Sequence, residues 1–159
     1  MFDALVLSKA DEESAPFAAV MQLEDADLPE GDVVVAVEYS TVNYKDGLCY
    51  SANGGGLVRN YPHVGGIDFA GTVESSRDHR YAPGDRVVLT GWRVGEAWWG
   101  GYAQKACVKA DWLVPLPDGL STREAMTVGT AGFTSMLAVQ ALEDHGSRPG
   151  LELRTGAWA

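Results

Sequence analysis

The sequence predicts a mainly β protein, a closed or nearly closed antiparallel barrel with a helix and the start of a further domain after it. Two observations predict the barrel: seven short segments rich in β-branched and apolar residues lie between residues 2 and 116, and Gly/Pro turns separate them. A third observation marks the end of the barrel, because apolar residues adopt helical spacing after Ser121.

The predicted strands are Phe2–Leu7, Val20–Leu23, Val33–Tyr39, Ile67–Val73, Arg86–Thr90, Tyr102–Lys109 and Trp112–Leu116. Val33–Tyr39 is the clearest of them, because most of its residues are β-branched or aromatic. Turns at Leu28–Asp32 and Tyr81–Asp85 contain both Pro and Gly. The run Ser51–Gly56 is expected to be a flexible loop, since no helix follows that would make its glycines a phosphate site.

After the barrel, Ser121–Glu124 fits a capping box that starts a helix. The apolar face of this helix is interrupted at Gly129–Gly132 and resumes from Phe133 to Leu142, and His145–Gly146 is a suitable end. A strand at Leu151–Thr155 and a turn then open a βαβ unit, which cannot bury itself alone. We therefore assign residues 1–125 to the barrel and 126–159 to a bridge helix and the start of a truncated second domain.

The composition restricts the classes of partner. The chain has 159 residues, of which 46% are hydrophobic, and its net charge of −10 argues against nucleic-acid and anionic-membrane surfaces. No apolar run approaches the roughly 20 residues that span a bilayer, and the N-terminus has no signal-peptide pattern. Cys49 and Cys107 form no metal or redox motif. These features favour the cytoplasm.

The stretch Tyr61–Glu74 places one carboxylate, Asp68, between Gly66 and Gly71 at the start of a buried strand. A buried acid must find a partner or shift its pKa. Two interpretations stay open at this point. Asp68 either accepts hydrogen bonds from backbone amides in a tight turn, or it lies on the wall of an active site.

Five motifs occur in an order found in a known family: Thr41-Val-Asn-Tyr-Lys-Asp46, Pro62 to Gly71, Pro83-Gly-Asp-Arg-Val87, Thr90 to Ala103, and Met126 to Thr134. On these motifs the chain resembles the zinc-free, quinone-oxidoreductase-like branch of the medium-chain dehydrogenase/reductase superfamily. Within that branch it is most similar to the NADPH-dependent acryloyl-CoA reductases. The resemblance implies a GroES-like barrel followed by a Rossmann domain, with the active site between them.

The resemblance also implies that no metal is bound. Zinc members of the superfamily have a Cys where this chain has Asn43, and a His-Glu pair where it has Ile67 and Asp68. Neither Ile nor Asn provides the ligand that such a site needs.

The activity implied is hydride transfer from NADPH to the double bond of a short enoyl-CoA such as acryloyl-CoA, which gives propionyl-CoA. Such a reaction needs a proton donor. The resemblance implies Tyr44, because reductases of this branch that act on enoyl thioesters have a Tyr at the matching position, and a phenol stays protonated at neutral pH. Lys45 and Asp46 lie beside it, and either one orients Tyr44 or the two pair. The remaining site residues implied are Asp68 in catalysis, Asn43, Gly129 and Thr130 at the cofactor, and Asp46 and Trp92 at the substrate.

Two alternatives remain beside this hypothesis. One is a zinc-free NADPH quinone oxidoreductase, which needs no buried proton donor. The other is a non-catalytic barrel module, since the glycine-rich dinucleotide turn expected after Leu151–Thr155 is not completed before residue 159. The resemblance further implies a homodimer.

Overall fold

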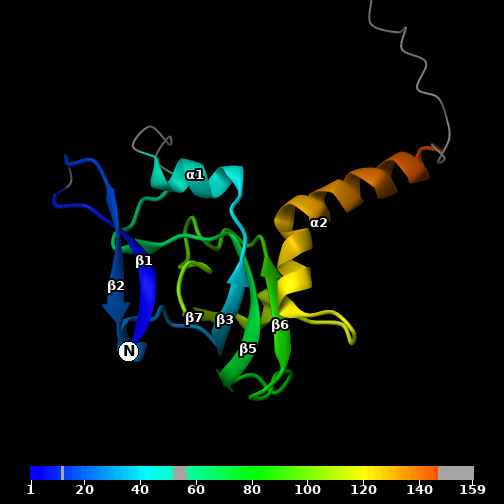
Figure 1. Cartoon of the computed structure of the whole chain (residues 1–159), viewed down its shortest axis with the longest axis horizontal. Helices are drawn as coiled ribbons and strands as arrows, with labels where there is room; N and C mark the ends of the chain where they lie inside the picture. Colours follow the sequence, from blue (N-terminus) through cyan, green and yellow to red (C-terminus); the bar gives the residue numbers. More distant parts are fainter. Residues whose placement is uncertain (12, 52–56, 147–159) are drawn as a thin grey trace, which may run out of the picture.

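The structure is a computed structural model that describes residues 1–11, 13–51 and 57–146. Its strands are β1 (Phe2–Ser8), β2 (Phe17–Leu23), β3 (Val33–Ser40), β4 (His63–Val64), β5 (Asp68–Ser76), β6 (Arg86–Thr90), β7 (Lys105–Val108) and β8 (Val114–Pro115). Its helices are α1 (Tyr44–Tyr50) and α2 (Thr122–Asp144), with short 3-10 turns at Asp25–Asp27 and Ala110–Trp112. Figure 1 shows α1 over one end of the strands and α2 beside β6.

The strands form two antiparallel sheets. One has five strands in the order β7-β3-β5-β6-β8, and the other has three in the order β2-β1-β4. An isolated bridge between Ala4 and Ala103 joins the sheets, and the amide of Leu5 donates to the Tyr102 carbonyl at 2.8 Å. The mainly β, nearly closed barrel expected from the sequence is therefore confirmed.

The main hydrophobic core lies against the inner face of the five-stranded sheet. Alternate residues of β3, Val33 and Val35, are fully buried against Phe69 of β5 and Leu89 of β6. This alternation is what a strand with one buried face requires. A Cβ on Gly71 would overlap the Ala36 carbonyl, so glycine allows β3 and β5 to approach closely.

Several local features differ from the predictions. Helix α1 was not predicted, because it has only seven residues and contains Gly47; Asn43 and Asp46 at its start were the available signal. Strand β4 was missed, and β2 begins at Phe17 rather than Val20. The predicted strand Tyr102–Lys109 shortens to β7, and Trp112–Leu116 shortens to β8 because Trp112 belongs to a 3-10 turn. The predicted strand Leu151–Thr155 and the glycines of the 51–56 loop lie outside the described residues.

Helix α2 begins where the capping box predicted. The Ser121 amide donates to Glu124 Oε2 at 2.9 Å, and the Glu124 amide donates to Ser121 Oγ at 3.2 Å. The helix breaks at Gly129, whose φ and ψ are 51° and −162°. It ends at Asp144 with His145 as the C-cap, and Gly146 has a φ of 84°. The bend in α2 is plain in Figure 1, while the proposed domain boundary at residue 125 remains a prediction.

Helix α2 also corrects the expectation that no apolar run approaches the length that spans a bilayer. Within the described residues it is the one helix whose length and apolar composition would allow it to cross a membrane. A helix that packs inside a folded domain meets the same criterion. The first part of α2 packs on the barrel, where Ala125 and Met126 are buried with Ala70 and Leu116.

Candidate active site

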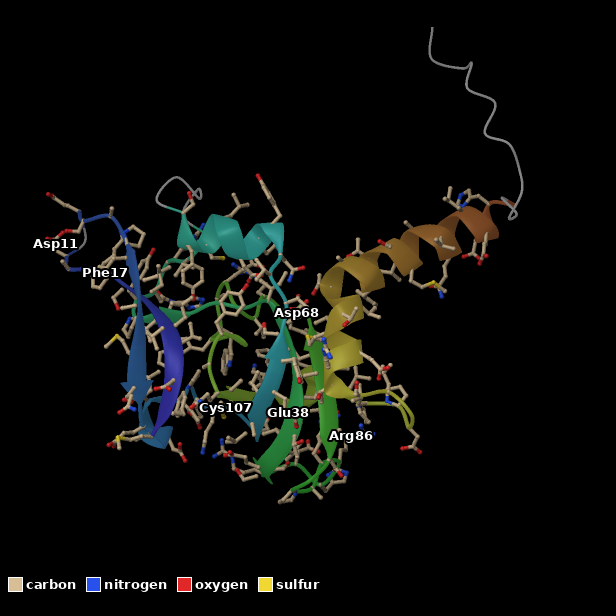
Figure 2. The ribbon with its side chains drawn as sticks, viewed as in Figure 1. Asp11, Phe17, Glu38, Asp68, Arg86 and Cys107 are labelled. Atoms are coloured by element: carbon tan, nitrogen blue, oxygen red, sulfur yellow. The ribbon has the colours of Figure 1, made fainter. Side chains whose placement is uncertain are left out.

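The centre of the candidate site is the carboxylate of Asp68, the first residue of β5, which is completely buried. Oδ1 accepts from the Thr41 hydroxyl at 2.6 Å and from the Thr41 amide at 3.2 Å. Oδ2 accepts from the Thr130 amide at 2.8 Å and from Asn43 Nδ2 at 3.3 Å. Asp68 therefore joins β5, the segment before α1, and the break in α2. Figure 2 shows it between β3 and α2.

Thr41 is a member of this network that sequence reasoning missed. Besides its two bonds to Asp68, its hydroxyl accepts from Asn43 Nδ2 at 2.8 Å, and its carbonyl accepts from the Tyr102 hydroxyl at 3.0 Å. Burial, followed by the nearby Asp46 carboxylate, raises the pKa of Tyr102. The phenol of Tyr102 therefore stays a donor and fixes Thr41 in place. Only the proximity of Thr41 to Asn43 in the motif pointed to it.

Gly129 and Thr130 meet Asp68 because α2 breaks there. A Cβ on Gly129 would lie 3.0 Å from Thr41 Cγ2 and 3.2 Å from Asp68 Oδ2, and its backbone conformation is one that essentially only glycine adopts. The break turns the Thr130 amide toward Asp68. The Thr130 hydroxyl is buried and has no hydrogen-bond partner in the described part of the chain. It is thus available to a bound group.

Tyr44 and its neighbours form the start of α1. Tyr44 is 84% exposed, and its hydroxyl has no hydrogen-bond partner among residues 1–11, 13–51 and 57–146. Lys45 pairs with Glu96 at 2.9 Å, so it does not pair with Asp46 as one sequence interpretation had it.

Asp46 is buried, and its oxygens accept from the Asn43 amide at 2.8 Å and the Ile67 amide at 3.0 Å. These bonds attach the first turn of α1 to the segment that enters β5. Asp46 also lines a cavity of about 490 Å³ with Leu5, Val42, Gly47, Tyr50 and Tyr102. The predicted contact of Asp46 with the substrate stays a prediction.

Trp92 lies two residues beyond Thr90, the register partner of Asp68. It is 59% exposed, and its ring stacks on Trp112 with 6.3 Å between centroids.

The structure thus gathers three predicted site residues, Asn43, Gly129 and Thr130, around Asp68. It leaves Tyr44 and Trp92 at exposed positions.

A second carboxylate fixes α2 to the barrel. Glu38 of β3 accepts from the hydroxyls of Thr72 and Thr122, each at 2.6 Å. These bonds, that of Thr122 first, lower the pKa of Glu38. Thr122 is the first residue of α2, so Glu38 and Asp68 hold the two ends of its first part.

The described residues contain no group of three or more His, Cys, Asp or Glu side chains that would hold a metal ion. Cys49 and Cys107 are buried and unpaired. The dinucleotide turn expected after Leu151–Thr155 lies outside the described residues.

Comparison with known proteins identifies the family of the barrel. Residues 29–118 match the model of the alcohol dehydrogenase GroES-like domain. Acrylyl-CoA reductase AcuI of Ruegeria pomeroyi is 73% identical over 150 residues, which are 94% of this chain and 45% of the relative. The chain thus spans less than half the length of this relative.

Two solved structures are similar over the same part. The YhdH oxidoreductase of Salmonella enterica in complex with NADP has 53% identity and a TM-score of 0.87, over 92% of this chain and 44% of that one. The Bacillus subtilis protein YhfP with NAD bound has 46% identity and a TM-score of 0.88, over 94% of this chain and 44% of that one. The chain therefore belongs to the alcohol dehydrogenase GroES-like domain family, within the medium-chain dehydrogenase/reductase superfamily.

Proposed function

We propose that this chain forms the substrate-side half of an NADPH-dependent enoyl-CoA reductase that converts acryloyl-CoA to propionyl-CoA. The observation that carries the proposal is the 73% identity to an acrylyl-CoA reductase over 94% of the chain. The network around Asp68 supports it, because it holds polar groups from separate segments at one point. The network fixes the Thr130 backbone beside its unpartnered hydroxyl, which leaves one preorganised donor at the site.

The residues at the break in α2 fit the nicotinamide end of the cofactor. The Thr130 hydroxyl is a buried donor without a partner in the described residues, and glycine at 129 allows the break that turns the Thr130 amide toward Asp68. We assign Thr130 and Asn43 to hold the nicotinamide, and Asp68 to orient both of them. NADPH, when bound, supplies the hydride. Both NADP and NAD occur in the similar structures, so the preference for NADPH belongs to the proposal.

The proton is assigned to Tyr44. Addition of hydride to the β-carbon of an enoyl thioester leaves negative charge on the carbonyl oxygen and at the α-carbon, which then needs a proton. Tyr44 carries a phenol without a hydrogen-bond partner in the described chain, at the start of a helix whose first turn Asp46 fixes. All four groups around Asp68 donate to it, so we assign Asp68 to orientation rather than to proton transfer.

The test is Tyr44→Phe in enzyme that is active on acryloyl-CoA. Turnover is expected to fall by about 100-fold, the lower range for a general acid, while the affinity for NADPH stays unchanged. Tyr39→Phe is the matched control, because Tyr39 is also an exposed tyrosine. Equal turnover of the Tyr44→Phe enzyme and the parent would exclude Tyr44 as the donor.

Two further functions are distinguished by simple measurements. A quinone oxidoreductase would reduce quinones faster than short enoyl-CoA thioesters. A non-catalytic barrel would be folded but would not bind NADPH in a titration followed by nicotinamide fluorescence. We also propose a homodimer in the cytoplasm, to be checked by light scattering and by fractionation.

A further inference from the structure

Three tryptophans form a cluster on the surface beyond β6. Trp92 stacks on Trp112 with 17° between the ring planes, and Trp98 meets Trp112 edge-on at 5.2 Å. Trp98 is fixed in turn, because its Nε1 donates to the Cys107 carbonyl at 2.8 Å. We call these three residues the Trp platform. Its outermost ring, Trp92, is 59% exposed and offers a supported aromatic surface to a planar ligand.

The backbone holds Trp92 outward at a conformational cost. Gly91, Trp92 and Arg93 have φ values of 88°, 56° and 59°, and non-glycine residues rarely adopt this left-handed region. The Arg93 carbonyl accepts from three amides, those of residues 96, 97 and 98, at 3.2, 2.9 and 3.3 Å. Strain that neighbouring bonds enforce in this way is typical of residues that contact a ligand.

Two cations accompany the platform. Lys109 Nζ lies 5.9 Å from the Trp98 ring and 5.4 Å from the Trp112 ring, and Arg93 follows Trp92 directly. Neither cation forms a salt bridge within residues 1–11, 13–51 and 57–146. Asp111, beside Trp112, is already paired with Arg80 at 2.7 Å.

Three other basic residues in the described part of the chain form ion pairs. Lys45, Arg80 and Lys105 each pair with acidic side chains, as expected in a chain with a net charge of −10. What distinguishes Lys109 is its position over two stacked indoles, with Arg93 next to Trp92 in the chain. Together the indoles and the two cations match a planar base that carries phosphate groups.

The position of the platform relative to Asp68 adds to this match. Trp92 lies just beyond Thr90, which is opposite Asp68 in the sheet, but it does not belong to the hydrogen-bond network of Asp68. A CoA thioester has its reactive acyl group at one end and an adenine nucleotide at the other. A site of two separate parts suits such a molecule.

We propose that the Trp platform, with Arg93 and Lys109, binds the adenine nucleotide end of the CoA thioester. The proposal rests on the proposed function for its choice of CoA. The adenosine phosphate end of NADPH shares the same chemistry, so the experiment includes both sources.

The test is calorimetric titration of the 159-residue chain with CoA, with pantetheine, which lacks the nucleotide, and with 2′,5′-ADP, which represents the adenosine end of NADP. Trp92→Leu is expected to weaken CoA binding by about tenfold or more, the range for loss of one base–aromatic stack. Trp92→Phe should keep most of the affinity. Arg93→Gln with Lys109→Gln should weaken binding and reduce its dependence on salt.

The matched control is Phe17→Leu, which removes another exposed aromatic ring, 53% exposed, on β2 of the other sheet. Circular dichroism of each variant confirms that it is folded. Weaker CoA binding with unchanged pantetheine binding supports the proposal. Weaker binding of 2′,5′-ADP alone supports a nucleotide site but assigns it to the cofactor, which overturns the choice of CoA.

Equal binding of both nucleotides by the parent and Trp92→Leu, or no binding of either by the parent, would overturn the site. These outcomes are separate from the proposed function, which is judged by turnover of acryloyl-CoA. An active reductase with no nucleotide effect at Trp92 would refute only the platform.

Discussion

The two parts of α2 differ in environment although they belong to one helix. In the first part, Thr122, Ala125, Met126 and Gly129 are buried. In the second part, Phe133, Met136, Leu137, Val139 and Leu142 are each between 45% and 58% exposed. Both parts have apolar side chains, so composition does not explain the difference.

Two carboxylates hold the first part of α2 on the barrel. Glu38 holds the Thr122 hydroxyl at the start of the first part, and Asp68 accepts from the Thr130 amide at its end. Thr130 is the first residue after the break at Gly129, so Asp68 acts as an acceptor at the beginning of the second part, where amides lack helical partners. The same carboxylate that organises the candidate site therefore sets where α2 leaves the barrel.

The largest expected effect comes from Asp68→Asn. The substitution keeps the size but replaces one acceptor oxygen with a donor, so that at least one of the four donors around Asp68 loses its partner. We expect the free energy of unfolding to fall by about 3 kcal/mol. Urea denaturation measures it. A loss below about 0.5 kcal/mol would mean that the network does not join α2 to the barrel.

Gly129→Ala should have the next largest effect, about 2 kcal/mol. The alanine Cβ would meet Thr41 and Asp68. Alanine would also have to adopt the positive φ of residue 129. Gly47→Ala is the matched control, because nothing lies within 4 Å of a Cβ there, and alanine in the helix should stabilise the chain by about 0.5 kcal/mol. Thermal denaturation of both variants tests the contrast, which disappears if Gly129→Ala is neutral.

The smallest effect on stability is expected in the second part of α2. Met136→Lys replaces a side chain that is 54% exposed, so the free energy of unfolding should change by less than about 0.5 kcal/mol. Self-association should decrease, because the exposed apolar face is reduced. Light scattering at increasing concentration measures this. A large loss of stability would show that the second part of α2 is packed in solution.

Features set by neighbouring residues could be predicted from the sequence, and contacts between residues far apart in the sequence could not. Most strands and the start of α2 were predicted, because alternating apolar residues and the Ser121–Glu124 capping box are local patterns. Asp68 stood out because an acid entered a buried strand. Its partners were harder to predict from the sequence, because Thr41 and Thr130 are 27 and 62 residues away and meet Asp68 only in the folded barrel. The short helix α1 was missed because seven residues give too weak a periodic signal.

The most direct test of the central role of Asp68 is amide hydrogen exchange in the folded chain. The Thr130 amide donates to a buried carboxylate, so we predict that it exchanges as slowly as the amides of β5. The amides of residues 134–144 should exchange much faster, because that part of α2 opens without disturbing the barrel. If the Thr130 amide exchanged as fast as those of residues 134–144, Asp68 would not hold α2, and this account of the site would be wrong.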